Sequence, residues 1–96
     1  MPRRAARIDD NHAEIVRALR DVGAGVQSLA AIGQGCPDLL VGFRGQCFCL
    51  EVKDGSKPHS RQALTPAEER WEENWPGHYR VVRTVDEALK AIGVLA

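Results

Sequence analysis

The sequence predicts an α+β fold in which one mixed sheet is flanked by helices. Residues 38–43 and 46–53 are β-rich runs on either side of Arg-Gly at 44–45, which indicates a hairpin. Thr-Pro-Ala-Glu at 65–68 and Thr-Val-Asp-Glu at 84–87 are helix starts, each with a capping threonine and a glutamate three residues later. Another β-rich run lies between these two helix starts, and helices placed in this way cover a sheet.

Length and composition limit the chain to one small domain, residues 1–96. Its composition, 44% hydrophobic and 27% charged residues, is that of a globular protein and excludes a disordered, collagen-like or coiled-coil chain. No apolar run approaches the roughly 20 residues of a membrane span, so we expect no membrane partner. The N-terminus lacks the apolar stretch of a signal peptide, and three cysteines cannot all pair. We therefore expect a reduced, cytoplasmic protein.

The charges balance but are unevenly distributed along the chain. The 13 basic and 13 acidic residues give a net charge of zero, which argues against a protein that coats nucleic acid by charge alone. The basic residues gather in two groups, Arg3, Arg4 and Arg7 at the N-terminus and Lys53, Lys57, His59 and Arg61 further on. We expect residues 1–8 to form a flexible basic arm. The chain could thus present a basic face to phosphates.

The N-terminal half predicts a helix and a first strand before the hairpin. Residues 9–22 favour a helix because their apolar residues share one face, and Asn11 with Glu14 resembles a capping pair. Residues 26–32 are small and apolar and predict the first strand. The sequence Gly-Gln-Gly-Cys-Pro at 33–37 interrupts that strand.

The C-terminal half predicts a loop, two helices and a strand between them. Residues 54–63 are polar and predict the loop. Trp71 and Trp75 lie one turn apart on the following helix, which stops at a Pro-Gly pair. Residues 79–83 predict the strand, and Gly93 closes the last helix. The predicted element order is α-β-β-β-α-β-α.

The hairpin register brings three charged residues together. With the turn centred on 44–45, the numbers of paired residues sum to 89, so Asp38 lies opposite Glu51. Paired residues point to one face and side chains alternate along a strand, so Lys53 joins the two acids. The other face of the hairpin is apolar. An odd-length loop would move Asp38 to that face, so the prediction depends on this register.

Two carboxylates that face each other across a ladder need compensation, because their Cβ atoms lie only about 4.5–5.5 Å apart. Lys53 supplies one positive charge, and a divalent cation compensates better. Asp38 and Glu51 offer hard oxygen ligands for Mg²⁺ or Mn²⁺, and the backbone carbonyl of Val52 is a third candidate ligand. The alternative is an ordinary surface salt-bridge cluster, which the apolar neighbours on the same face disfavour.

The acids and the lysine resemble a known nuclease signature. Pro-Asp at 37–38 and Glu-Val-Lys at 51–53 match the PD-(D/E)xK motif of restriction-endonuclease-like nucleases. The preceding Gly-Cys at 35–36, the following Asp-Gly-Ser-Lys at 54–57 and the element order make the chain similar to the VRR-NUC branch. The similarity is to the small stand-alone proteins of phages and bacteria, and it covers residues 11–89.

The resemblance implies a restriction-endonuclease-like core and a metal-dependent DNA endonuclease. Proteins of this type are linked to cutting branched DNA such as Holliday junctions, usually as homodimers, in a bacterial or phage-infected cell. By resemblance, Asp38 and Glu51 are metal ligands, and Lys53 orients the attacking water or stabilises negative charge. Glu14 matches the acid that often completes the site, with a plain helix-start charge as the alternative. Other acids that could take its place are Asp9, Asp10 and Asp21.

One position departs from the family pattern. The family often has glutamine just after the Leu-Thr-Pro that opens the second helix, whereas Ala67 and Glu68 stand there in this chain. Gln62 lies before the helix, in the predicted loop, and is a possible substitute. The departure leaves the role of this helix open without affecting the predicted metal ligands.

The predicted mechanism is metal-assisted hydrolysis of a phosphodiester. The metal would polarise a phosphate oxygen and lower the pKa of a coordinated water, and its charge would also lower the pKa of Lys53. The expected contacts to backbone phosphates are Lys57, His59, Arg61, Gln62, Arg3, Arg4 and Arg7. No helix is rich in Arg, Asn and Gln, so selection by DNA shape is favoured over base reading. Two symmetric cuts on a two-fold substrate call for a dimer.

Three alternatives stand beside the nuclease. The same fold could be a catalytically idle DNA-binding or assembly module, or a core for hetero-association through the helix of Trp71 and Trp75. We expect these tryptophans to be core or dimer contacts rather than base-stacking platforms. A zinc site is disfavoured because a C-x-C spacing lies outside the usual range. It would use Cys36, Cys47, Cys49 and His59.

Overall fold

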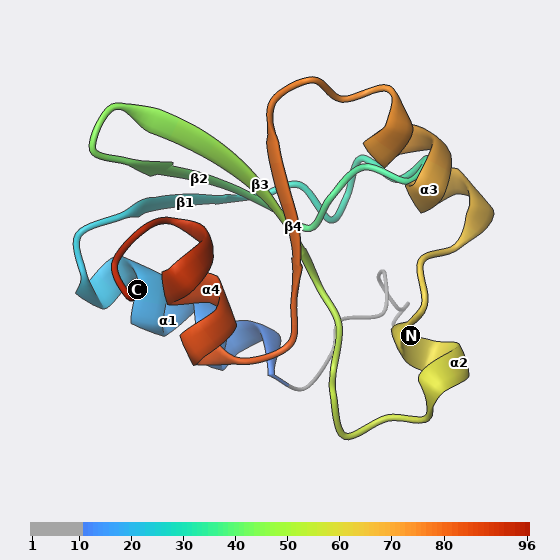
Figure 1. Ribbon diagram of the computed structural model, residues 1–96, viewed down its shortest axis with the longest axis horizontal. Coiled ribbons are helices and arrows are strands. Elements are labelled where there is room, and N and C mark those ends of the chain that lie inside the picture. The colour runs from blue at the N-terminus through green and yellow to red at the C-terminus, as the bar shows by residue number, and fades with distance from the viewer. Residues whose placement is uncertain (1–10) are drawn as a thin grey trace, which may run out of the picture.

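The computed structural model describes residues 11–96 and contains one four-stranded sheet in the order β1-β2-β3-β4 (Figure 1). The strands are β1 (Gly25–Ser28), β2 (Leu39–Phe43), β3 (Gln46–Val52) and β4 (His78–Val82). The helices are α1 (His12–Asp21), α2 (His59–Gln62), α3 (Pro66–Glu73) and α4 (Val85–Ala91). Strands β1, β2 and β3 pair antiparallel and β3 pairs parallel with β4, which confirms the predicted mixed sheet flanked by helices.

The hairpin has the predicted register. Leu39 pairs with Leu50 and Leu40 pairs with Cys49, so paired residue numbers sum to 89. The turn residues Arg44 and Gly45 both have positive φ, 51° and 81°. This backbone twist matches that of the two strands and fixes a two-residue turn, so the register is set locally.

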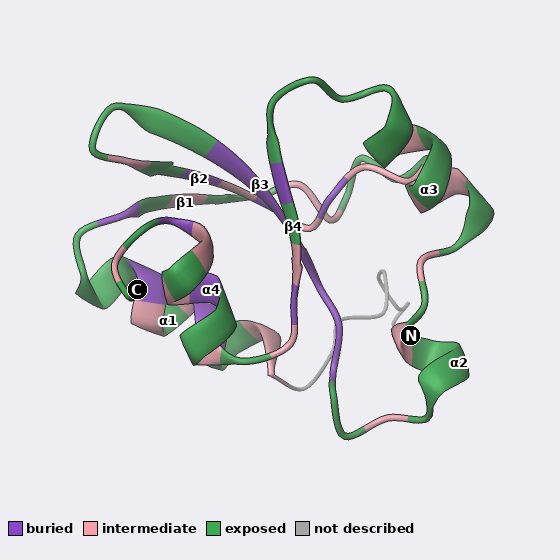
Figure 2. Cartoon of the chain, viewed as in Figure 1, coloured by how far each residue is buried: buried purple, intermediate pink, exposed green. Residues whose placement is uncertain are grey.

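The hydrophobic core lies between the sheet and the pair of helices α1 and α4. In Figure 1 these helices lie together beside β1 and β2, whereas α2 and α3 lie beyond β4. The buried residues are concentrated where α1, α4 and the sheet meet (Figure 2). The largest fully buried ones are Ile15, Leu19, Leu39, Leu50, Val41, Val82 and Pro37. Neither α2 nor α3 has a buried residue, so the second pair of helices adds little apolar burial.

The largest differences between the predicted and the observed elements concern β1, the loop at 54–63 and α3. Strand β1 stops at Ser28 rather than residue 32, because its partner β2 follows Pro37, which has no N–H for a ladder. The predicted loop 54–63 contains the one-turn helix α2, which begins after Pro58. Helix α3 has the predicted Thr65 capping box but ends at Glu73, so Trp75 lies past its end.

The predicted capping pair at the start of α1 is wrong. Asn11 occupies the N-cap position, but its side chain makes no capping hydrogen bond. Its Nδ2 instead donates to the carbonyl oxygens of Lys53 (3.0 Å) and Arg83 (2.7 Å). These carbonyls follow directly after β3 and β4, so Asn11 ties the start of α1 to the ends of two strands. The basic arm with Arg3, Arg4 and Arg7 lies outside the described residues.

Candidate metal centre

Asp38 and Glu51 meet where β2 begins and β3 ends. Oδ2 of Asp38 accepts a hydrogen bond of 2.8 Å from the backbone N–H of Val52, which fixes the carboxylate against β3. Glu51 is only 3% exposed, and its Oε1 is buried without a hydrogen-bond partner among the described residues. A buried carboxylate oxygen without a partner, beside a second carboxylate, is a donor set that suits a hard cation.

The ionisation of the two acids reflects their closeness. Burial, and next the negative charge of Asp38, raise the pKa of Glu51 well above its usual range. Burial also raises the pKa of Asp38. Hydrogen bonds to this carboxylate from the Val52 N–H and from the Glu51 carboxyl group act in the opposite direction and lower that pKa. Two like charges in a poorly solvated place are unfavourable, so without a cation the pair retains a proton.

Lys53 lies beside the acids and is 9% exposed. Its Nζ lies 3.0 Å from Oε1 of Glu68 and 3.5 Å from Oε2 of Glu51. Burial alone lowers the pKa of Lys53, but its contacts with Glu68 and Glu51 outweigh burial and raise it. Without a cation these contacts therefore favour the charged form of the lysine, whereas the lowered pKa predicted for Lys53 concerns the site with a metal bound.

Glu68 is the residue of the site that the sequence analysis did not assign. Its Oε1 accepts from the Thr65 N–H at 2.9 Å, closing the capping box of α3, and also from Lys53. Burial raises the pKa of Glu68, but these two donors outweigh it and lower the pKa. The signal was present in the sequence, since a capping box fixes where its glutamate points.

Helix α1 carries the predicted site residue Glu14 and, two positions earlier, His12. Glu14 is exposed on α1, and among residues 11–96 no group of three or more His, Cys, Asp or Glu side chains is placed to hold a metal ion. His12, on the same helix, is half-buried, and its Nε2 is buried without a hydrogen-bond partner among these residues. His12 lies close enough to Asp38 to act electrostatically on the pKa of that carboxyl, so α1 approaches the acids at His12.

Two further side chains border the acids. Tyr79 pairs with Cys49 in the sheet, and its buried hydroxyl has no hydrogen-bond partner within the described part of the chain. Burial and then the charge of Glu51 raise the pKa of Tyr79. Burial raises the pKa of Cys36 as well, and the charges of Glu51 and Asp38 add to the effect. These shifts place a phenol and a thiol within electrostatic reach of the acid pair.

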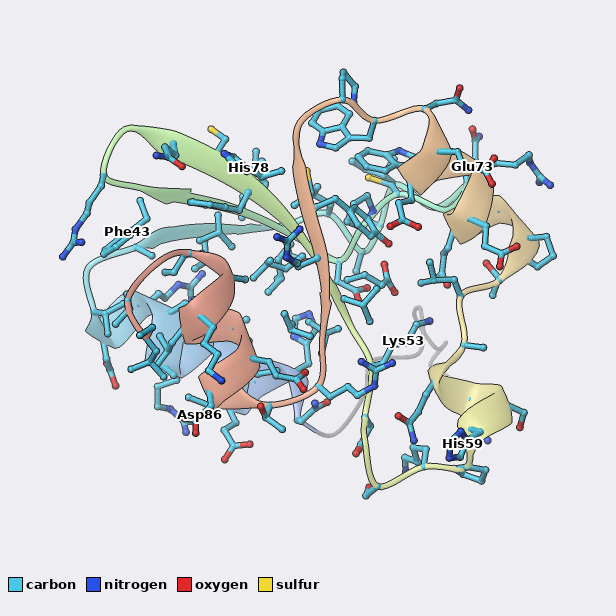
Figure 3. The ribbon with its side chains drawn as sticks, viewed as in Figure 1. Phe43, Lys53, His59, Glu73, His78 and Asp86 are labelled. Carbon is cyan, nitrogen blue, oxygen red and sulfur yellow. The ribbon has the colours of Figure 1, made fainter. Side chains whose placement is uncertain are left out.

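The predicted phosphate contacts follow β3 on the segment that contains α2. His59 and Arg61 are exposed, and Figure 3 shows Lys53 and His59 on the same side of β4. Gln62 is used within the chain: its Nε2 donates to the Lys57 carbonyl (2.7 Å), and its Oε1 accepts from Nε of Arg83 (2.9 Å). Gln62 therefore holds this segment to the end of β4.

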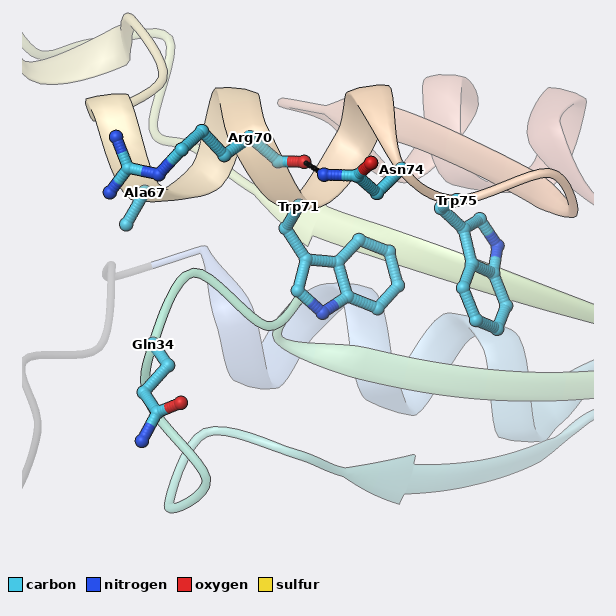
Figure 4. Close-up of a pocket in the computed structure, with 6 residues that line it drawn as sticks. All are labelled: Gln34, Ala67, Arg70, Trp71, Asn74 and Trp75. Carbon is cyan, nitrogen blue, oxygen red and sulfur yellow. Dashed lines mark hydrogen bonds between the residues drawn. The ribbon is translucent and has the colours of Figure 1, made fainter.

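The two tryptophans lie outside the hydrophobic core, so the core prediction for them is wrong. Their rings stack at 4.8 Å, and Trp71 also contacts Tyr79 at 5.9 Å. Trp75 is 42% exposed, because α3 ends before it and its indole N–H bonds the His78 carbonyl. The stack borders an open cavity of about 430 Å³ (Figure 4). The cavity is lined by Gln34, Ala67, Arg70, Trp71, Asn74 and Trp75.

Comparison with known proteins identifies the fold. No family model and no curated protein matches the chain. A solved structure described as "VRR_NUC domain" superimposes with a TM-score of 0.62 at 24% sequence identity. The match covers 88% of this chain and 96% of that chain. The resemblance predicted from the motif is therefore confirmed at the level of the fold.

None of the helices within residues 11–96 is long and apolar enough to cross a membrane.

Proposed function

We propose that the protein is a metal-dependent endonuclease that hydrolyses DNA phosphodiester bonds, with Asp38 and Glu51 holding Mg²⁺ or Mn²⁺. The observation that carries this proposal is the buried Glu51 oxygen without a partner beside a second carboxylate. A structural ion-pair cluster would satisfy that oxygen, because an unpaired buried acceptor is costly. Mg²⁺ is commonly held by one or two carboxylates and keeps several waters, so two acids are sufficient.

The backbone supports a third oxygen ligand. In a strand, the N–H and C=O of one residue point to the same side of the backbone. The N–H of Val52 points at Asp38, because it donates to Oδ2 of that residue. The carbonyl of Val52 therefore also points toward Asp38, as the ligand set of Asp38, Glu51 and Val52 requires.

The chemistry of the site follows from these residues. When bound, the cation supplies positive charge beside a phosphate oxygen and acidifies a water. Lys53 lies 3.5 Å from Glu51, so its ammonium group would stabilise the negative charge of a phosphate bound beside the acids. Glu68 contacts Lys53 at 3.0 Å and raises its pKa, which favours the charged form of the lysine in the resting protein.

We also propose that the substrate is branched DNA cut by a homodimer. Lys57, His59 and Arg61 follow β3, and they would contact backbone phosphates next to the acids. Phosphate contacts carry no sequence information, which favours recognition of DNA shape. A four-way junction has two-fold symmetry, so two cuts on it call for two copies of the site.

The test is cleavage of junction, linear duplex and single-stranded DNA with Mg²⁺, Mn²⁺ or EDTA. We expect cleavage with either metal, none in EDTA, and at least about 100-fold slower cleavage for Asp38→Ala and Glu51→Gln. Glu73→Gln makes the same chemical change on an exposed part of α3 and serves as the control, with wild-type rates. Wild-type cleavage by either acid variant would refute the proposal, and DNA binding without metal-dependent cleavage would leave the idle module.

A further inference from the structure

A cationic cleft lies at the far end of the sheet from the acids. Its volume is about 380 Å³, and it is bordered by the hairpin turn, β4 and the end of α4. Its charged residues come from these three elements: Arg44, Arg80 and Lys90. No aspartate or glutamate lines the cleft. Three positive charges from separate elements thus face a common space without an acid between them.

The two arginines of the cleft are held in place without losing their charge. The two ion pairs within residues 11–96 both involve Lys53, so neither neutralises a charge of the cleft. The guanidinium of Arg44 lies 4.8 Å above the ring of Phe43, and Nη1 of Arg80 donates to the Tyr79 carbonyl at 3.0 Å. An arginine has five N–H donors, so most donors remain for an anion.

The sheet separates the cleft from the acids. Phe48 and His78 line the cleft; they pair across β3 and β4, and their ring centroids lie 4.8 Å apart. Arg80 also lines the cleft and pairs with Leu50, which faces the helices. Glu51 is three positions from Phe48, so its side chain points to the opposite face, about 10 Å further along the strand. Figure 3 shows Phe43 on one side of β4 and Lys53 on the other.

We propose that this cleft binds the phosphate backbone of a DNA arm other than the arm presented to the acids. The inference rests on the proposed nuclease function and names a second contact with the same substrate. Arginine forks match phosphate oxygens, and a chain without net charge needs a local cationic site to hold a polyanion. Because the cleft and the acids lie on opposite faces, one straight duplex does not reach both, whereas a branched molecule does.

The experiment measures binding in EDTA, where no cutting occurs. A variant with Arg44→Gln and Lys90→Gln removes two charges from the cleft. The control, Arg17→Gln with Arg70→Gln, removes two exposed charges elsewhere. The dissociation constants for a four-way junction and a linear duplex are compared between about 50 and 200 mM salt. Unfolding curves of both variants confirm that they fold.

We expect the cleft variant to bind the junction about tenfold more weakly, and its slope of log K against log salt to fall by about 2. Linear duplex binding, and both substrates with the control, stay within about twofold of wild type. Equal weakening of junction and linear duplex would overturn the inference, because it would place both sites on one duplex. Unchanged junction binding would also overturn it. So would a competition experiment in which polyglutamate displaces the junction as effectively as DNA of equal charge displaces it.

Cleavage assays separate this inference from the proposed function. Metal-dependent cleavage that requires Asp38, together with junction binding unaffected by the cleft variant, would reject the cleft alone. Loss of junction affinity in the cleft variant, in a protein that cuts no DNA with any metal, would reject the nuclease alone. Because the control variant also removes two positive charges, both conclusions are independent of a general loss of positive charge.

Discussion

Lys53 is the residue on which the two charged parts of the site converge. Its ammonium lies between Glu51, which belongs to the acid pair, and Glu68, which belongs to the capping box of α3. One oxygen of this glutamate at the start of α3 therefore both closes the helix cap and accepts a hydrogen bond from the lysine, which raises the pKa of Lys53. A neutral glutamine at this position would keep an acceptor for the cap but would remove the negative charge.

Glu68→Gln tests this link. The contacts with Glu68 raise the pKa of Lys53, so the variant lowers that pKa. Whether the reaction uses the charged or the neutral lysine, the limb of the pH–rate profile that Lys53 controls moves to lower pH. Glu69→Gln, the exposed neighbour on α3, should leave the profile unchanged. An unshifted profile for Glu68→Gln would show that Glu68 serves only the helix cap.

Glu51→Gln tests how much the acid pair lowers the free energy of unfolding. The pKa of Glu51 is raised in the folded protein, so between its ordinary value of about 4.3 and the raised value the folded state binds more protons than the unfolded state. The free energy of unfolding therefore falls as pH rises through that interval. In EDTA at pH 8 we expect Glu51→Gln to be more stable than wild type by about 1 kcal/mol or more.

Urea unfolding of Glu51→Gln from pH 5 to 8.5 provides the measurement, with Glu73→Gln as the control. The Glu51 variant should lose the decline in stability with rising pH that wild type and the control share. Identical pH slopes for all three proteins would mean that Glu51 ionises normally in the fold.

At the level of elements, the loop before β2 and helix α3 are fitted to each other. Gly33, Gln34 and Gly35 all have positive φ, and a Cβ at Gly35 would overlap the carbonyl of Ala67. The close approach places the start of α3, and with it Glu68, against the loop that leads to Asp38. Gly35 thus helps to position Glu68 in the site.

Gly35→Ala should therefore be far more harmful than Gly33→Ala. Both glycines have positive φ, but a Cβ at Gly33 meets nothing within 4 Å, so Gly33→Ala carries only the conformational cost of about 1 kcal/mol. Gly35→Ala adds displacement of α3, and we expect a loss of at least about 2 kcal/mol. Denaturation curves give both values, and equal losses would mean that α3 moves aside freely.

Much of this arrangement could be predicted from the sequence where the signals are local. The Arg44-Gly45 turn fixed the register and so the meeting of Asp38 with Glu51. The bond from Asn11 to the ends of β3 and β4 could not be predicted, because it joins residues 42 and 72 positions apart. The same holds for His12, whose importance depends on how α1 docks on the sheet.

Across the whole molecule, burial is divided unequally between two sides of β4. The core fills the space under α1 and α4, whereas α2 and α3 have no buried residue. The second side is held by single contacts, among them Lys53 with Glu68 and Gln62 with Arg83. Elements with little apolar burial open at lower free energy than the global unfolding.

Hydrogen exchange should show this division. We expect backbone amides of α3 to exchange at least about tenfold faster than those of β2 and β3, because local opening of α3 exposes little apolar surface. Mass spectrometry of peptides from each segment gives the rates, with α4 as an internal comparison. Equal protection in α3 and β3 would show that the fold opens as one unit.

The stacked indoles beside α3 have a practical consequence. The chain has two tryptophans, and both belong to the side of β4 without a core of its own. Their ultraviolet emission therefore reports the attachment of α3 rather than the integrity of the sheet. Monitoring that emission alongside circular dichroism during unfolding would give two curves, and the interval between them would measure how independently the weaker side detaches.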